Sequence, residues 1–130
     1  MRAILFRRSS YLSIYSLEQD ERTDEVRSFL SGINDPVDGG YVRGFIQIVN
    51  RIAEGAWPLL PNEQKKCWEQ DGFWLCELRK GCWRISCFTE SGRLVLGTVF
   101  RKSKNKQKKE YNRAVSLFRR FINNPDWEEG

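Results

Sequence analysis

Histidine is absent from this chain of 130 residues, and cysteine, proline and methionine are scarce. The lack of histidine excludes a ribonuclease that uses histidine as its acid or base. The cysteines are Cys67, Cys76, Cys82 and Cys87. None forms a Cys-x-x-Cys pair, so neither a zinc site nor another metal site is expected. We expect four reduced thiols that pack mostly as small apolar side chains.

Long apolar runs are also missing. No stretch approaches the roughly 18 residues that a membrane span needs. The N-terminal sequence MRAILFRRSSYL lacks the apolar region of an export signal, so we expect a cytoplasmic protein with no membrane partner. An apolar fraction of 40% predicts a folded chain, and the length predicts a single domain over residues 1–130, with a short polar tail after about residue 123. No cofactor is expected.

Positive charge is concentrated in the second half of the chain. Residues 79–120 carry 13 basic and 2 acidic side chains, although the whole chain has a net charge of only +5. The densest run is RKSKNKQKKEYNR, residues 101–113, in which seven residues are Lys or Arg. Such a field attracts polyanions. The run could be a solvated tail, a targeting signal or a nucleic-acid surface, and its place between an apolar strand and an apolar-striped helix favours the last.

Apolar spacing outlines the secondary structure. It predicts helices at about 24–33, capped by Thr23, 41–52 and 111–122. Short apolar or alternating runs predict strands at 3–6, 73–79, 83–89 and 93–100, and residues 55–72 are expected to form a connection. Short glycine-containing turns between the last three strands predict an antiparallel meander. The expected fold is one α+β domain in the order β-α-α-β-β-β-α, with an antiparallel sheet and helices packed on one face.

Arg84 is the candidate phosphate ligand of the middle strand. Side chains alternate along a strand, so Arg84 points away from the apolar set and is expected on the open face of the sheet. Arg79 ends the preceding strand, and Arg101 and Lys102 end the following one, so a meander would gather these cations on one surface. A guanidinium can grip a phosphate with two parallel hydrogen bonds. An ordinary solvated arginine is the alternative.

Tyr111 and Glu110 begin the last predicted helix, directly after the basic run. Tyr111 could pack in the core, or it could stack on a base or donate a proton. Glu110 could simply favour the helix N-terminus, or it could act as a general base. RNA cleavage by a 2′-hydroxyl needs mainly positioning and charge stabilisation, which Arg, Lys, Tyr and Glu can supply.

The order of these motifs resembles a known family. Glu77-Leu78-Arg79 ends one strand, Trp83-Arg84 opens the next, and Phe100-Arg101-Lys102 ends the third. A basic loop and a helix with Glu110 and Ala114 follow. Over roughly residues 20–122 the chain resembles the RelE/ParE toxin superfamily, in its phage-related, HigB-like branch.

The resemblance implies a cytoplasmic toxin of a bacterial toxin–antitoxin pair. Many such toxins are mRNA interferases, metal-independent endoribonucleases that cleave mRNA in the ribosomal A site, where they also contact ribosomal RNA. A small helix-turn-helix antitoxin is the implied partner. By position, the catalytic candidates are Arg84, Lys102, Tyr111 and Glu110. The candidate RNA-binding residues, which share positive charge around them, are Arg79, Arg101, Lys104, Lys106, Lys108, Lys109 and Arg113.

The chain departs from this family at several positions. Leu75 and Glu77 stand where the best-studied ribosome-dependent nucleases carry lysines, and the loop has Ser103 without the T-x-x-x-P pattern. These departures leave open a non-catalytic RNA- or protein-binding module of the same fold, such as a gyrase inhibitor or a phage regulatory protein. A basic domain that binds an acidic partner is a third interpretation.

Overall fold

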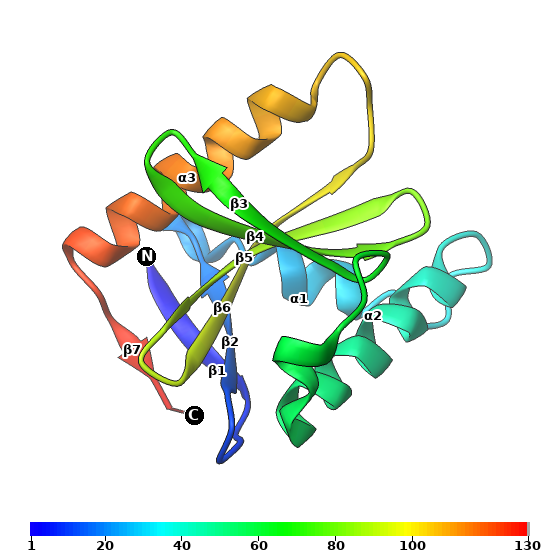
Figure 1. The fold of residues 1–130 in the computed structure, drawn as a ribbon, viewed down its shortest axis with the longest axis horizontal. Helices are drawn as coiled ribbons and strands as arrows, with labels where there is room; N and C mark the ends of the chain where they lie inside the picture. Colours follow the sequence, from blue (N-terminus) through cyan, green and yellow to red (C-terminus); the bar gives the residue numbers. More distant parts are fainter. Residues whose placement is uncertain (130) are drawn as a thin grey trace.

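The computed structural model describes residues 1–129, and these form a seven-stranded mixed sheet (Figure 1). The strands are β1 (Arg2–Arg7), β2 (Ser13–Glu18), β3 (Lys65–Gln70), β4 (Phe73–Lys80), β5 (Trp83–Glu90), β6 (Arg93–Arg101) and β7 (Trp127–Glu128). Their order across the sheet is β3-β4-β5-β6-β2-β1-β7. Strands β3 to β6 form an antiparallel meander, whereas β2 runs parallel to β6 and β7 runs parallel to β1.

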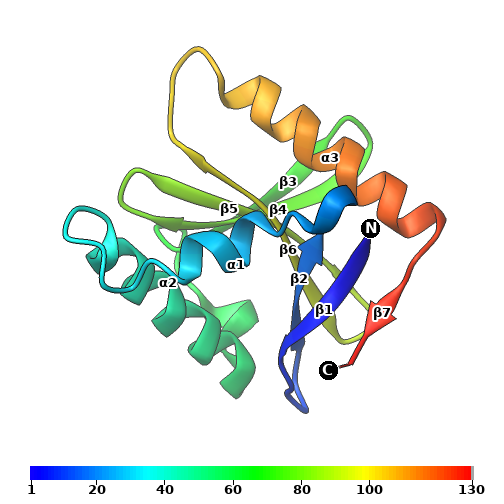
Figure 2. The ribbon, with the colours of Figure 1, turned by 180° about the vertical axis from the view of Figure 1, so that it is seen from behind.

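Helices cover both faces of this sheet (Figures 1 and 2). The α-helices of the described chain are α1 (Glu25–Leu30), α2 (Gly39–Arg51) and α3 (Gln107–Asn123). Shorter helical turns occur at Asp20–Arg22, Ile52–Ala56 and Trp57–Leu59. Helices α1 and α2 lie on one face, and α3 crosses the other, which we call the α3 face.

The two faces bury separate apolar cores. Under α1 and α2, Phe45 and Val26 pack with sheet residues such as Ile85. Under α3, Phe118 packs with residues such as Phe88, and the ring centroids of these two lie 4.8 Å apart. Each fully buried side chain of this size contributes about 1.5–3 kcal/mol. The central strands are apolar on both faces because both faces are covered.

The predicted fold is wrong in the order of its helices and strands along the chain, in its sheet type and in the placement of its helices. The observed order is β-β-α-α-β-β-β-β-α-β, the sheet contains parallel pairs, and α3 lies opposite α1 and α2. Strands β2, β3 and β7 were not expected: β2 pairs with the sequence-distant β6, β3 is a polar edge strand, and β7 has two residues. The predicted meander is present as β4, β5 and β6.

Two local predictions also change. Asp24, not Thr23, caps α1, because its Oδ1 accepts the backbone N–H of Arg27 at 2.9 Å. The segment expected to be a polar tail returns to the sheet as β7, where Trp127 packs edge-on against Tyr15. Backbone pairing therefore joins the C-terminal segment to β1, and an aromatic contact joins it to β2.

The expectation of four reduced thiols is wrong. Cys67 on β3 and Cys76 on β4 lie directly opposite each other, with Cα atoms 4.0 Å apart, and form a disulfide. The pairing was hidden because residues 55–72 were expected to lack a strand. Cys82 and Cys87 are free thiols. Among the described residues, no helix is long and apolar enough to cross a membrane.

Candidate nucleic-acid interface

A cleft of about 330 Å³, lined by cationic and aromatic side chains, opens on the α3 face between α3 and the β3–β4 hairpin. Its lining is Lys66, Trp68, Arg79 and Tyr111. Trp68 packs edge-on against Tyr111, with ring centroids 4.8 Å apart. Phe100 packs on Tyr111 as well, at 5.6 Å. The two rings hold the phenol at the cleft, where the side chains of Lys66 and Arg79 also end.

Glu77 lies behind this cleft, opposite Lys66 in the β3–β4 pairing, and is fully buried. Its Oε1 accepts a hydrogen bond from Arg79 Nε at 2.9 Å and lies 3.8 Å from Arg84 Nε. Within the described chain, its Oε2 has no hydrogen-bond partner. A buried carboxylate oxygen without a partner is costly, and local costs of this kind gather at functional sites.

Arg84 is not on an open face, contrary to prediction. It does point away from the apolar set, but α3 covers that face, and only 7% of Arg84 is exposed. Its Nη1 donates to the carbonyl oxygens of Gly81 and Trp83 at 2.8 and 2.9 Å. Arg84 therefore braces the β4–β5 turn and the buried Glu77.

Tyr111 packs against aromatic neighbours, as one of its two interpretations predicted, and its hydroxyl reaches the cleft. Its Oη accepts a hydrogen bond from Gln107 Nε2 at 2.9 Å. Burial and the nearby Glu77 carboxylate raise the pKa of Tyr111 to about 12. The phenol is therefore protonated at neutral pH. Since Gln107 uses an acceptor site of Oη, the phenolic proton is left for an acceptor, and the hydrogen bond with the Glu77 carboxylate that helps to raise this pKa takes it when no ligand is bound.

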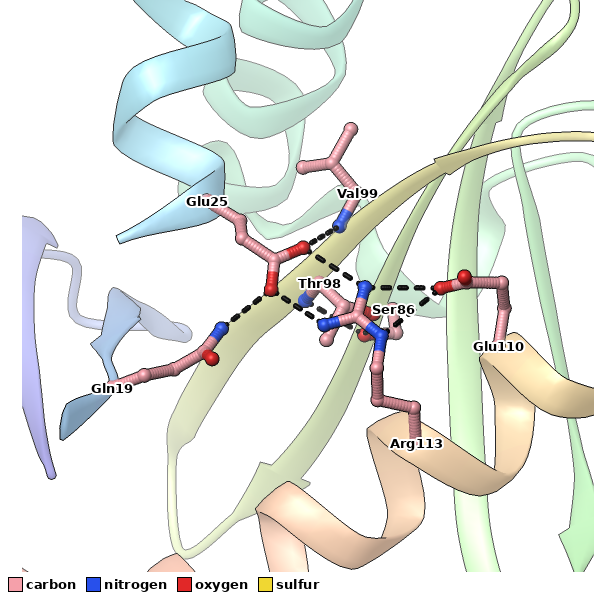
Figure 3. A network of polar contacts seen from close by, with 7 residues as sticks. All are labelled: Gln19, Glu25, Ser86, Thr98, Val99, Glu110 and Arg113. Atoms are coloured by element: carbon pink, nitrogen blue, oxygen red, sulfur yellow. Dashed lines mark hydrogen bonds and ion pairs between the residues drawn. The ribbon is translucent and has the colours of Figure 1, made fainter. Parts of the chain in front are cut away.

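Glu110 and Arg113 belong to a different cluster, which joins α3 to α1 (Figure 3). The Arg113 guanidinium donates to both oxygens of Glu25, at 2.6 and 3.0 Å. It also donates to Glu110 Oε2, at 3.0 Å from Nη2. Gln19 Nε2 donates to Glu25 at 2.6 Å. Neither Glu110 nor Arg113 lines the cleft, and each is held by an ion pair.

This cluster sits where the sheet opens. Strand β2 pairs with β6 only as far as Leu96, so the backbone N–H of Val99 needs another acceptor. Glu25 Oε1 accepts it at 3.3 Å (Figure 3). Below the cluster, the hydroxyls of Ser86 and Thr98 share a buried hydrogen bond of 2.6 Å. The cluster therefore replaces strand pairing, which gives Glu110 and Arg113 a structural role.

The basic run forms a loop at residues 102–106 and the first turn of α3. Its exposed lysines are Lys102, Lys104, Lys106, Lys108 and Lys109. None of them forms an ion pair with a side chain that the structure describes. Lys106 is the N-cap of α3 and provides no side-chain cap. Positive charge is unfavourable beside the positive end of a helix dipole, and a bound anion would relieve this cost.

Arg101 is the last residue of β6 and lies opposite Trp83, the first residue of β5. It is exposed, and its guanidinium carbon lies 5.5 Å from the centre of the Trp83 ring. Of the predicted site residues, the cleft thus unites Arg79 and Tyr111, with Arg84 behind them. Lys102 and the other loop lysines lie along the chain directly before Tyr111.

Lys66, Trp68 and Glu77 complete the site, and none of the three was predicted as a site residue. Glu77 was named only as a motif residue and as a departure from the family, and Lys66 and Trp68 were not singled out. Both lie on β3, within a segment expected to be a connection. The Asp71-Gly72 pair could have revealed this strand, because such a pair between two strands is a strong hairpin signal. Both residues have the positive φ angles, 52° and 75°, that this turn requires.

Comparison of the chain with family models, with curated proteins and with solved structures finds no match. Among the described residues, no group of three histidine, cysteine, aspartate or glutamate side chains is placed to hold a metal ion. The site is therefore interpreted from the chemistry of its own side chains.

Proposed function

We propose that the protein is a cytoplasmic toxin that binds single-stranded RNA in the cleft and cleaves mRNA at the ribosome. The observation that carries this proposal is the convergence of Lys66, Arg79 and the protonated phenol of Tyr111 on one hollow. Five exposed lysines precede Tyr111 along the chain and supply affinity for phosphates. The resemblance to RelE/ParE toxins, which remains a prediction, supplies the ribosome as the place of action and a helix-turn-helix antitoxin as the partner.

The proposed reaction is a transesterification within the RNA. The 2′-hydroxyl loses its proton to solvent water as its oxygen attacks the adjacent phosphorus. The bond to the 5′ oxygen breaks, and a 2′,3′-cyclic phosphate and a 5′-hydroxyl result, after which the Tyr111 phenolate regains a proton from water. Lys66 and Arg79 would stabilise the charge that develops on the phosphate oxygens. Tyr111 would donate its proton to the departing 5′ oxygen, a role that contributes about 10²–10⁴-fold in rate.

Glu77 and Arg84 would act as positioning residues in this reaction. Glu77 accepts the Nε–H of Arg79, which orients the Arg79 guanidinium at the edge of the cleft. Arg84 lies behind Glu77 and is itself held by backbone carbonyls. A guanidinium with its orientation set before binding loses less freedom when a phosphate arrives.

A second candidate function is RNA binding without cleavage. One observation favours it: the carboxylates near the cleft already form ion pairs with arginines of the protein. Glu77 is buried against Arg79, and Glu110 is paired with Arg113, so neither is free to take the proton of a 2′-hydroxyl. Binding through Lys66 and Arg79 needs no general base.

The decisive experiment maps RNA ends in a translating extract. Wild-type protein should create new 5′-hydroxyl ends in mRNA, and the Lys66→Ala/Arg79→Ala variant should lose both binding and cleavage. Tyr111→Phe should bind RNA normally but cut it about 10²–10⁴-fold more slowly. Arg8→Ala is the matched control, because Arg8 is an exposed cation in the β1–β2 connection, away from α3 (Figure 1).

The outcomes separate the candidates. RNA binding without new ends would support the non-catalytic function and reject cleavage. A protein that neither binds nor cleaves RNA would reject both candidate functions. Double-strand breaks in DNA with translation initially intact would instead identify a gyrase inhibitor.

A further inference from the structure

A second hollow, of about 740 Å³, lies along the edge strand β3. Its lining includes Trp57, Pro58, Lys65, Lys66, Trp74 and Arg79. Two large aromatic rings and three cations therefore meet in one open space, and no carboxylate is among the lining residues. A hollow of this size can hold a small ligand, and this combination suits an aromatic ligand with negative charge.

Trp74 is the ring in this hollow that is free to bind. It is 61% exposed, although it lies on a strand whose next four residues are buried. Among the described side chains, no aromatic ring or cation stacks on it, whereas Lys65 Nζ lies 4.5 Å from the centre of the Trp57 ring. Lys65 also donates to the backbone carbonyl of Trp57, so that ring face is occupied. A ligand can therefore stack on Trp74 without displacing an internal contact.

The hollow adjoins the cleft under α3 through two shared residues. Lys66 and Arg79 line both spaces, so these two cations stand between Tyr111 on one side and Trp74 on the other. A strand of RNA has the matching pattern, because each phosphate is followed by a base with a π-face. Proteins that bind single strands combine cations along the backbone with aromatic rings for the bases.

We propose that the hollow along β3 is a nucleobase subsite for single-stranded RNA. A base stacks on Trp74 while the neighbouring phosphate is held by Lys66 and Arg79, and the chain continues past Tyr111 toward the lysine loop. This subsite rests on the proposed function, because the cleft must bind RNA for the strand to reach Trp74. A double helix would be bound more weakly, since its bases cannot turn outward to the ring.

Binding of labelled RNA tests the subsite. The probe is a single-stranded 2′-O-methyl oligoribonucleotide of about ten nucleotides, which fits single-strand site sizes and cannot be cut. Trp74→Ala should weaken its binding about 5- to 100-fold, the value of one base stack. Trp74→Tyr should restore most of the affinity. Leu59→Ala is the matched control, because Leu59 is an 81% exposed apolar residue that does not line the hollow.

A second probe of the same length that lacks its bases identifies the contact. Wild-type protein should bind it more weakly than the intact probe, and Trp74→Ala should make no further difference. Normal binding of the intact probe by Trp74→Ala, beside weak binding by Lys66→Ala/Arg79→Ala, would overturn the subsite and leave the proposed function standing. An equal effect of Trp74→Ala on both probes would overturn base stacking. No binding of the intact probe by wild-type protein would overturn the proposed function and the subsite together.

Discussion

The guanidinium of Arg113 on α3 grips the carboxylate of Glu25 on α1 through hydrogen bonds of 2.6 and 3.0 Å. The two helices lie on opposite faces of the sheet, and they meet where β2 and β6 separate (Figures 1 and 3). Because α3 also carries Tyr111, this pair helps to fix the cleft against the rest of the molecule. A cation predicted to bind RNA is therefore part of the framework.

Arg113→Ala should lower the free energy of unfolding by about 1–2 kcal/mol, because it removes charged hydrogen bonds that are only partly screened by solvent. Urea unfolding followed by circular dichroism measures this change. Arg120→Ala is the control: Arg120 pairs with Asp20 at 2.7 Å, but both side chains are mostly exposed. Its loss should stay within about 0.5 kcal/mol. Equal losses in the two variants would contradict the tethering role of Arg113.

The same cluster predicts a pH dependence of stability. Burial opposes ionisation of Glu25, but hydrogen bonds from Arg113 and Gln19 outweigh it and lower the pKa of Glu25 in the folded protein. The stabilisation is therefore complete above the unfolded-state pKa of about 4.3 and is lost as the pH falls through the lower folded-state pKa. Unfolding free energies of wild type and Glu25→Gln should differ at pH 7 and converge in acid. A difference independent of pH would rule out the Glu25 carboxylate as the cause.

The disulfide between Cys67 and Cys76 should stabilise the β3–β4 hairpin. Closing a loop of this length contributes about 2–3 kcal/mol in the chain-entropy model. Reducing agent should therefore lower the melting temperature of the wild-type protein. The Cys67→Ser/Cys76→Ser variant should melt at the temperature of the reduced wild type, whether or not reducing agent is present. Cys82→Ser leaves the disulfide intact and is the control. A wild-type melting temperature that is unchanged by reducing agent would contradict the disulfide.

Gly97 on β6 should not tolerate a side chain. A Cβ at this position would collide with the ring of Phe118, which is fully buried. Gly97→Ala should lower the free energy of unfolding by about 1–3 kcal/mol, the usual cost of overpacking. Gly40→Ala in α2 is the control, since a Cβ at Gly40 would lie 3.9 Å from Arg43 Nη2, an ordinary van der Waals contact. A Gly97→Ala variant as stable as Gly40→Ala would show that α3 can move away from β6.

Tyr111 should ionise late in an alkaline titration. Its pKa of about 12 means that its tyrosinate absorbance should develop above about pH 11, later than that of an ordinary tyrosine near pH 10. The difference in absorbance between wild type and Tyr111→Phe isolates this step. A raised folded-state pKa also means that the neutral phenol favours folding below pH 10, and this contribution declines as the pH rises further. A difference that develops near pH 10 would contradict the buried setting of Tyr111.

Local spacing in the sequence was enough to predict the strands now seen as β4, β5 and β6, the region of each α-helix and the pairing of the meander. Alternation of apolar residues and short glycine turns act between neighbours in the chain, so they are visible without a fold. The positive run was also predicted, together with its position between a strand and a helix. The direction of Arg84, away from the apolar set, followed from the same alternation.

Tertiary structure alone decided which side chains face the solvent and which meet. Lys66 reaches the cleft only because the polar edge strand β3 pairs with β4. Arg84 is buried because α3 covers the face of the sheet that was predicted to be open. Arg113 forms an ion pair with Glu25, which is 88 residues away in the sequence. These outcomes depend on pairings between distant segments, whose energies come from packing and desolvation and leave no periodic pattern in the chain.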